Sequence, residues 1–291
     1  MGRAERRFDL GKYLGRIVLT CILAGAVIAQ TLPPTYIGQT KFSRGQDVVP
    51  SFDGWIRNPD GSFTMVFGYM NRNYEEELAI PAGADNKLEP GPVDQGQPTY
   101  FLPRRHAWVF RVRVPADWGN RELVWTITAH GRTEKAYGSL QSQEEMLERL
   151  IMTRGNLSPG LDDPNKPPSI TIAPVEAAAV GSPVTLTALV TDDGLPKPRA
   201  PKSAPAAGSG RAQTNSAAAG PRLGLNVTWM EYRGPGKVVF ENVDPILVTE
   251  GKAATRAHFT VPGTYVLRAA ANDGELSTTS DLTVTVAPGQ P

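Results

Sequence analysis

Acidic side chains stand in two turns of the C-terminal half and are the clearest candidates for metal chemistry. One turn is Asp192–Gly194 and the other is Asn272–Glu275. Carboxylate and amide oxygens are the ligands that Ca²⁺ takes in proteins. The same Asp-Gly and Asn-Asp-Gly sequences also favour turns that need no ligand. The sequence leaves both interpretations open: simple turns with no cofactor, or a Ca²⁺ site made by Asp192, Asp193, Asp273 and Glu275.

A second segment combines aromatic rings with amide groups. It lies just before Glu75–Glu77 and contains Tyr69, Asn71, Arg72, Asn73 and Tyr74. Rings offer flat apolar faces, and amides both donate and accept hydrogen bonds, a combination that suits a sugar. Aromatic residues on alternating strands are also common in cores. We predict a ligand-binding face here, with core packing as the alternative.

Residues arranged for catalysis are sparse. The three histidines do not stand at the spacing of a metal site, and the sequence contains no nucleophile elbow or phosphate-binding loop. Carboxylates at Asp53 and Glu75–Glu77 could do general acid and base work, but only at a defined separation inside a cleft. We predict a protein that is not an enzyme, with a carboxylate-dependent hydrolase as an alternative.

The length of the chain limits the number of domains, and its net charge limits the kinds of partner. The chain has 291 residues, with 30 lysines and arginines against 29 aspartates and glutamates. This length suits about two domains. The balanced charge offers no strong field to hold a nucleic acid, so we predict no nucleic-acid partner.

The first 29 residues have the layout of a signal peptide. Basic residues up to Arg16 precede an apolar run, Ile17–Ala29, with small residues near its end. The run is shorter than the roughly 20 residues of a spanning helix. We predict cleavage after residue 29 and a periplasmic or extracellular protein; an uncleaved segment would be its only membrane contact. The single cysteine, Cys21, lies in this run, so the mature chain would have no disulfide.

Residues 51–140, after a linker at 30–50, show the alternation of half-buried strands. Apolar side chains occupy every second position in Phe63–Tyr69 and His106–Val114. The sequence Asn58–Gly61 is a strong turn signal and predicts a hairpin. Short strands joined by short turns favour a β-sandwich.

Residues 141–168 are predicted to form a helix and then a linker. Apolar residues recur at helical spacing within Gln141–Arg154, at Met146, Leu147, Leu150 and Ile151. This apolar face has two possible roles: it packs on its own domain, or it docks a partner in an envelope complex.

Residues 169–288 contain about seven short strands, the number expected of an Ig-like sandwich. They are interrupted by Leu195–Arg222, which is dominated by Ala, Pro, Gly, Ser and Lys. Such a composition cannot bury enough apolar surface to offset the entropy of ordering. We predict a disordered insertion at 195–222.

Local signatures in this half resemble the PKD-like and related Ig-like domains of secreted bacterial proteins. They are Val190–Gly194, Val227–Trp229, Gly234–Gly236, Val239–Phe240, Phe259–Leu267, Ala271–Gly274 and Leu282–Val286. The resemblance covers about residues 169–288 and does not extend to the N-terminal half. It implies an extracellular spacer or adhesion module without catalysis of its own.

These patterns predict an all-β protein with two β-sandwich (Ig-like) domains joined by a helix and linker, after a signal peptide. The predicted function is an exported, non-catalytic binding or structural (adhesion or spacer) protein. Its predicted partner is a protein or glycan of the cell envelope. An accessory subunit of an envelope complex is the alternative.

Overall fold

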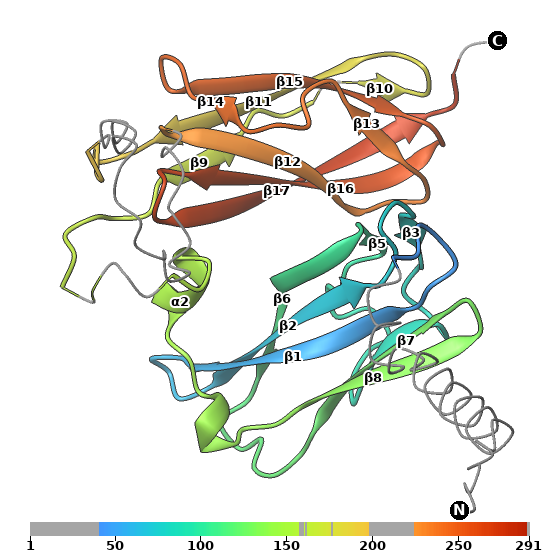
Figure 1. Ribbon diagram of the computed structural model, residues 1–291, viewed down its shortest axis with the longest axis vertical. Helices are drawn as coiled ribbons and strands as arrows, with labels where there is room; N and C mark the ends of the chain where they lie inside the picture. Colours follow the sequence, from blue (N-terminus) through green and yellow to red (C-terminus); the bar gives the residue numbers. More distant parts are fainter. Residues whose placement is uncertain (1–40, 157–159, 161, 176, 198–223, 290–291) are drawn as a thin grey trace, which may run out of the picture. The chain divides into compact units, whose positions relative to one another are not determined.

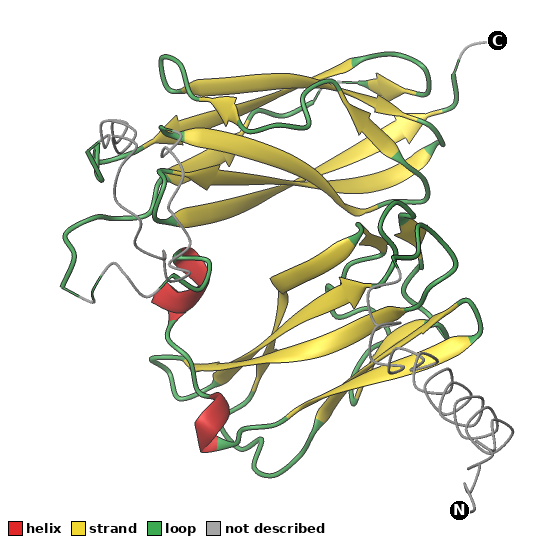
Figure 2. Cartoon of the chain, in the orientation of Figure 1, coloured by secondary structure: helices red, strands yellow, loops and turns green. Residues whose placement is uncertain are grey.

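Strands dominate the part of the chain that the structure describes (Figure 2). This computed structural model describes residues 41–289, apart from 157–159, 161, 176 and 198–223. Within these ranges the helical elements are a 3₁₀ turn, η2 (Ser142–Glu144), and a short helix, α2 (Glu148–Met152). The all-β prediction is confirmed. Nowhere in these ranges does a helix reach the length and apolar character needed to span a bilayer.

Several predicted segments fall outside the described residues. These are the signal peptide (1–29), most of the linker (30–50) and most of the insertion (195–222). At the C-terminal end of the predicted linker, Val48–Pro50 already belongs to the first strand.

Two three-stranded sheets and a two-stranded ladder build the N-terminal sandwich (residues 48–138). One sheet has the order β1-β2-β6, made by Val48–Arg57, Phe63–Asn71 and Arg104–Val114, which lie side by side in Figure 1. The other has the order β4-β7-β8, made by Asn86–Glu89, Leu123–Ala129 and Arg132–Gly138. The ladder pairs β3 (Leu78–Ala79) with β5 (Tyr100–Phe101).

An aromatic cluster fills the space between these sheets. The ring of Trp125 lies 4.7 Å from that of Phe110 and 6.1 Å from that of Phe67, both edge-on. All three side chains are buried. Period-two alternation brings them together, because every second residue of a strand points to the same face. The turn after β1 forms as predicted, with Asn58 N donating to Ser62 O at 2.9 Å.

Two sheets also build the C-terminal sandwich (residues 169–287). One has the order β10-β17-β16-β12-β14, made by Ala178–Ala179, Ser277–Ala287, Gly263–Asn272, Asn226–Arg233 and Ile246–Leu247. The other has the order β13-β15-β11-β9, made by Val238–Phe240, Lys252–Phe259, Val184–Thr191 and Ser169–Ile172. Their inward rows form a second hydrophobic core that includes Trp229, Tyr265 and Leu267. This layered arrangement is Ig-like.

The helix predicted over 141–154 is wrong in extent. Between η2 and α2 the backbone is extended at Glu145 and Leu147 and pairs with β1, where Met146 N donates to Trp55 O at 2.8 Å. Just before η2, Gln141 O accepts from the Trp55 side chain, at 2.8 Å from Nε1. Because β1 is an edge strand, its free backbone groups attract this segment. Tertiary pairing therefore outweighs helical spacing here, and α2 keeps only five residues.

Candidate functional site

Three of the five residues predicted to bind a ligand are fully buried. Tyr69, Asn71 and Asn73 each have 0% exposure. The hydroxyl of Tyr69 accepts from Leu102 N at 3.0 Å, and Asn71 Nδ2 donates to Phe101 O at 3.1 Å. Asn73 Nδ2 donates to Gln46 O at 2.9 Å. These polar groups hold β2 and the residues after it to other segments of the chain, as the core alternative expected, so a ligand at the surface does not reach them.

The other two predicted ligand residues reach the surface, where each contacts a charged neighbour. Arg72 Nη1 lies 3.3 Å from Asp47 Oδ2, and the Arg104 guanidinium lies 3.9 Å from the centre of the Tyr74 ring. Ligand binding at Arg72 and Tyr74 stays a prediction.

Three of the four carboxylates considered for hydrolysis, Asp53, Glu76 and Glu77, also have structural partners. Asp53 lies beneath Arg105, with Nη2 and Oδ1 2.6 Å apart, and accepts from Trp108 N at 2.7 Å. Glu76 Oε2 accepts from the backbone of Gly45 at 2.7 Å. Glu77 accepts from the Tyr100 hydroxyl at 2.6 Å. Each of these three carboxylates thus connects separate segments of the chain.

The two acidic turns lie at the same end of the C-terminal sandwich. Ser169, the first residue of β9, pairs with Thr191, the last residue of β11, so the linker before β9 meets the turn after β11. Lys166 N donates to Asp193 Oδ2 at 3.0 Å. Burial, together with the charges of Asp273 and Asp193, raises the pKa of Asp192. The second acidic turn is therefore within electrostatic reach of the first.

Hydrogen bonds inside each turn satisfy one carboxylate oxygen of Asp192 and one of Asp273. Asp192 Oδ2 accepts from Gly194 N at 3.0 Å, and Asp273 Oδ1 accepts from Leu276 N at 2.7 Å. Within the described residues, no three His, Cys, Asp or Glu side chains come close enough together to hold a metal ion. The predicted set of Asp192, Asp193, Asp273 and Glu275 therefore does not converge as four carboxylate ligands.

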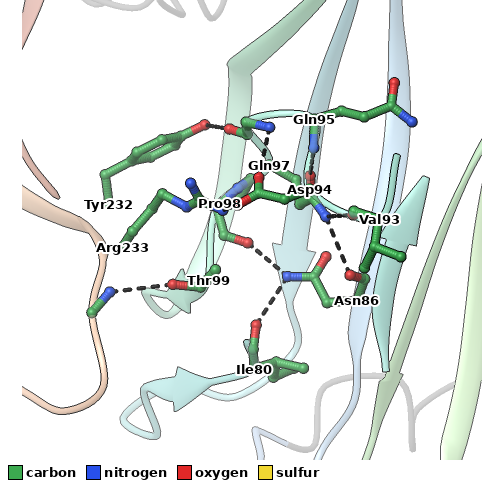
Figure 3. A network of polar contacts seen from close by, with 12 residues as sticks. Ile80, Asn86, Val93, Asp94, Gln95, Gln97, Pro98, Thr99, Tyr232 and Arg233 are labelled. Atoms are coloured by element: carbon green, nitrogen blue, oxygen red, sulfur yellow. Dashed lines mark hydrogen bonds and ion pairs between the residues drawn. The ribbon is translucent and has the colours of Figure 1, made fainter. Parts of the chain in front are cut away.

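The long loop between β4 and β5 forms a polar network that the sequence did not reveal (Figure 3). Buried Asn86 donates to Ile80 O at 2.9 Å and to Pro98 O at 2.8 Å, and it accepts from Trp125 Nε1 at 2.9 Å. Gln97 Nε2 donates to Val93 O at 2.7 Å. Glycine, proline and amide residues in 81–99 signal a loop, but nothing in their spacing indicates which amides become buried.

The same loop contacts β12 of the C-terminal sandwich, and the described residues of the two sandwiches belong to one compact unit. The Tyr232 hydroxyl donates to Gly96 O, and Arg233 Nη2 lies 2.7 Å from Asp94 Oδ2 (Figure 3). Tyr232 is 4% exposed and belongs to the hydrophobic core of the N-terminal sandwich. We call the contacts that Tyr232 and Arg233 make with this loop the joint.

A bulge in β12 makes the joint possible. The register shifts between Glu231 and Arg233, so that the two consecutive residues Glu231 and Tyr232 are both buried. Arg268, on the neighbouring strand, covers the Tyr232 ring at 3.9 Å and donates to Val109 O. Strict alternation would have left one of the two buried residues exposed, which is why the sequence pattern did not identify Tyr232.

A shallow hollow of about 460 Å³ lies elsewhere on the N-terminal sandwich. It is lined by Leu78–Asp85 and Thr128–His130, which include none of the predicted site residues. His130 Nε2, at its rim, lies 3.2 Å from Glu76 Oε2. The hollow adds no support to the predicted ligand face.

Comparison with known proteins yields no family for this chain. No family model and no curated protein matches it. Similar solved structures include a conjugative transposon lipoprotein from Bacteroides eggerthii, with 10% identity, 41% of this chain and 98% of that chain covered, and a TM-score of 0.27. Domains 4 and 5 of the S-layer protein SbsC share 10% identity with this chain, and the match covers 58% of this chain and 66% of that one, with a TM-score of 0.23. The D00-D0 domain of intimin shares 10% identity, and the match covers 83% of this chain and 100% of that one, with a TM-score of 0.26. These similarities are too low to bear on function.

Proposed function

We propose that the mature chain is an exported, non-catalytic structural protein of the cell envelope or extracellular space. In this proposal its two Ig-like sandwiches act as a stiff spacer that presents a surface to a protein or glycan. The observation that carries the proposal is the joint, in which Tyr232 from one sandwich completes the hydrophobic core of the other.

The contacts at the joint favour a fixed arrangement over a flexible one. Full burial of a side chain of this size contributes about 1.5–3 kcal/mol. Around it, Lys237 Nζ lies 2.9 Å from Glu77 Oε1, and Thr99 N donates to Tyr232 O at 3.3 Å. Exposed ion pairs add little stability, but they fix register. A spacer needs this resistance to bending, whereas an independent pair of domains does not.

Two features of the sequence support export and a spacer role. Residues 1–29 have the layout of a signal peptide, and the signatures within 169–288 resemble those of PKD-like domains of secreted proteins. The PKD-like assignment stays a prediction, as does the extracytoplasmic location.

We favour a spacer over an accessory subunit docked through residues 141–154. Only Glu148–Met152 is helical, and the Arg111 guanidinium lies 2.6 Å from Glu148 Oε1, which ties α2 to β6. Leu147 is exposed, while Leu150 and Ile151 are half-buried, so these apolar residues do not form one open face. We do not favour a partner at this helix.

Two experiments test the proposal: one follows export of the chain, and the other measures the stability of the joint. Expression of the full chain in a diderm bacterium should give a product outside the cytosol with residues 1–29 removed; an unprocessed cytosolic product would contradict export. Calorimetry should show one unfolding transition for the wild type and for Tyr137→Ala, an exposed control. Tyr232→Ala should lose about 3–5 kcal/mol and separate two transitions. An unchanged single transition in Tyr232→Ala would refute the stiff spacer.

A further inference from the structure

Three buried oxygen atoms at the end of the C-terminal sandwich lack a hydrogen-bond partner among the described residues. They are Asn165 Oδ1, Asp192 Oδ1 and Asp273 Oδ2; the amide nitrogen Nδ2 of Asn165 has no partner either. Asn165 is 3% exposed and Asp273 is 6% exposed. Buried polar atoms in folded proteins nearly always have a partner, so three such atoms in one region need an explanation.

The chain brings these three residues to one place. Asn165 directly precedes Lys166, whose backbone N donates to Asp193 Oδ2, so Asn165 lies beside the turn that contains Asp192. Asp273 is close enough for its charge to act on Asp192. Among the described residues, neither Asp192 nor Asp273 forms an ion pair with a lysine, arginine or histidine. The site therefore combines negative charge with acceptors that no described residue uses.

We propose that Asn165, Asp192 and Asp273 bind a Ca²⁺ ion through these three side-chain oxygens. Two carboxylates and one amide, completed by backbone carbonyls or water, make an oxygen site of the kind that Ca²⁺ accepts in flexible geometry. Mg²⁺ demands near-octahedral geometry and dehydrates reluctantly, so it fits a mixed, partly buried set less well. Asn165 is the ligand that inspection of the acidic turns alone did not find, and Glu275 is not required.

A cation here would attach the linker to the C-terminal sandwich. Asn165 belongs to the segment that leads from α2 to β9, while Asp192 follows β11 and Asp273 follows β16. Binding would therefore hold together three separate segments at one end of the sandwich. This inference rests on the three residues themselves and does not depend on the proposed function.

Calorimetric titration of the full chain with CaCl₂, after EDTA treatment, tests the site directly. We expect one site with a Kd of about 10⁻⁴–10⁻³ M, the range of extracellular modules, and a rise in Tm on saturation. Asp192→Asn and Asp273→Asn should each weaken binding by about tenfold or more. Asp244→Asn makes the same charge change at an exposed position and should bind as the wild type does.

A gain-of-function variant keeps the test decisive if a loss variant folds poorly. Asn165→Asp adds a third carboxylate and should tighten Ca²⁺ binding by about tenfold, because affinity rises with ligand charge. Circular dichroism in EDTA would confirm that each variant is folded. An absence of heat and of any Tm shift in the wild type at about 10 mM CaCl₂, well above this range, would overturn the proposal. Equal affinity of Asn165→Asp, Asp192→Asn and the wild type would overturn it too.

Discussion

Replacing Glu231 by glutamine should stabilise the protein at mildly alkaline pH. The Glu231 residue is 1% exposed, and its Oε2 accepts from Val238 N at 2.8 Å. Oε1 has no hydrogen-bond partner among the described residues. Burial, with a further contribution from the charge of Glu77, raises the pKa of Glu231 from 4.5 to about 8. The folded protein therefore holds this carboxyl in its neutral form at neutral pH.

The sign and size of the effect follow from proton linkage. Because the folded pKa lies above the unfolded one, the folded state binds more protons between the two values, and stability falls as pH rises through this window. The slope is about 1.4 kcal/mol per pH unit. Burial lowers the pKa of His106, which acts in the opposite sense below its unfolded value of about 6.5. The effect of Glu231 is therefore best separated from that of His106 between pH 6.5 and 8. Over this interval Glu231 lowers the free energy of unfolding by about 2 kcal/mol.

Urea unfolding of the wild type and Glu231→Gln at pH 6.5 and 8 measures this difference. Glutamine keeps an acceptor for Val238 N but cannot ionise, so the variant should lose less than half as much stability as the wild type over this interval. In thermal unfolding at pH 8, the Tm of the variant should exceed that of the wild type by about 4–8 °C. Glu122→Gln, at an exposed position, is the control. Equal pH slopes for the wild type and Glu231→Gln would refute the reasoning.

Three substitutions, one of them a control, test packing and hydrogen bonding in the N-terminal sandwich. In Gly138→Ala the new Cβ would lie 2.9 Å from Phe67 Cζ and 3.0 Å from Phe52 Cδ2, so thermal unfolding should show a loss of about 1–3 kcal/mol. Gly83→Ala, whose nearest atom would be 3.9 Å away, should stay within about 0.5 kcal/mol of the wild type. Asn86→Ala removes three buried hydrogen bonds and should cost about 3–5 kcal/mol in urea unfolding. A loss below 1 kcal/mol would show that water replaces the amide.

Period-two alternation was enough to identify the longer strands and much of the core, but it did not reveal short strands such as β4, Asn86–Glu89. Phe67, Phe110 and Trp125 stand at alternate positions of their strands, in the rows predicted to share one face, and all three are buried in the structure. The turn at Asn58–Gly61 was equally predictable, because proline and glycine restrict or release φ locally. Such features depend on neighbours within a few residues, which the sequence displays directly.

Contacts between distant segments decided the rest. Asn71 and Asn73 form internal hydrogen bonds because β5 and the segment before β1 offer carbonyl partners, and Glu145 pairs with β1 because that strand has a free edge. Pairing between distant segments likewise produces the bulge that buries Tyr232 in the core of the N-terminal sandwich. It also brings Asn165 close to the acidic turns. A sequence shows which side chains are polar or apolar, but burial and hydrogen bonding are properties of the neighbours that folding supplies.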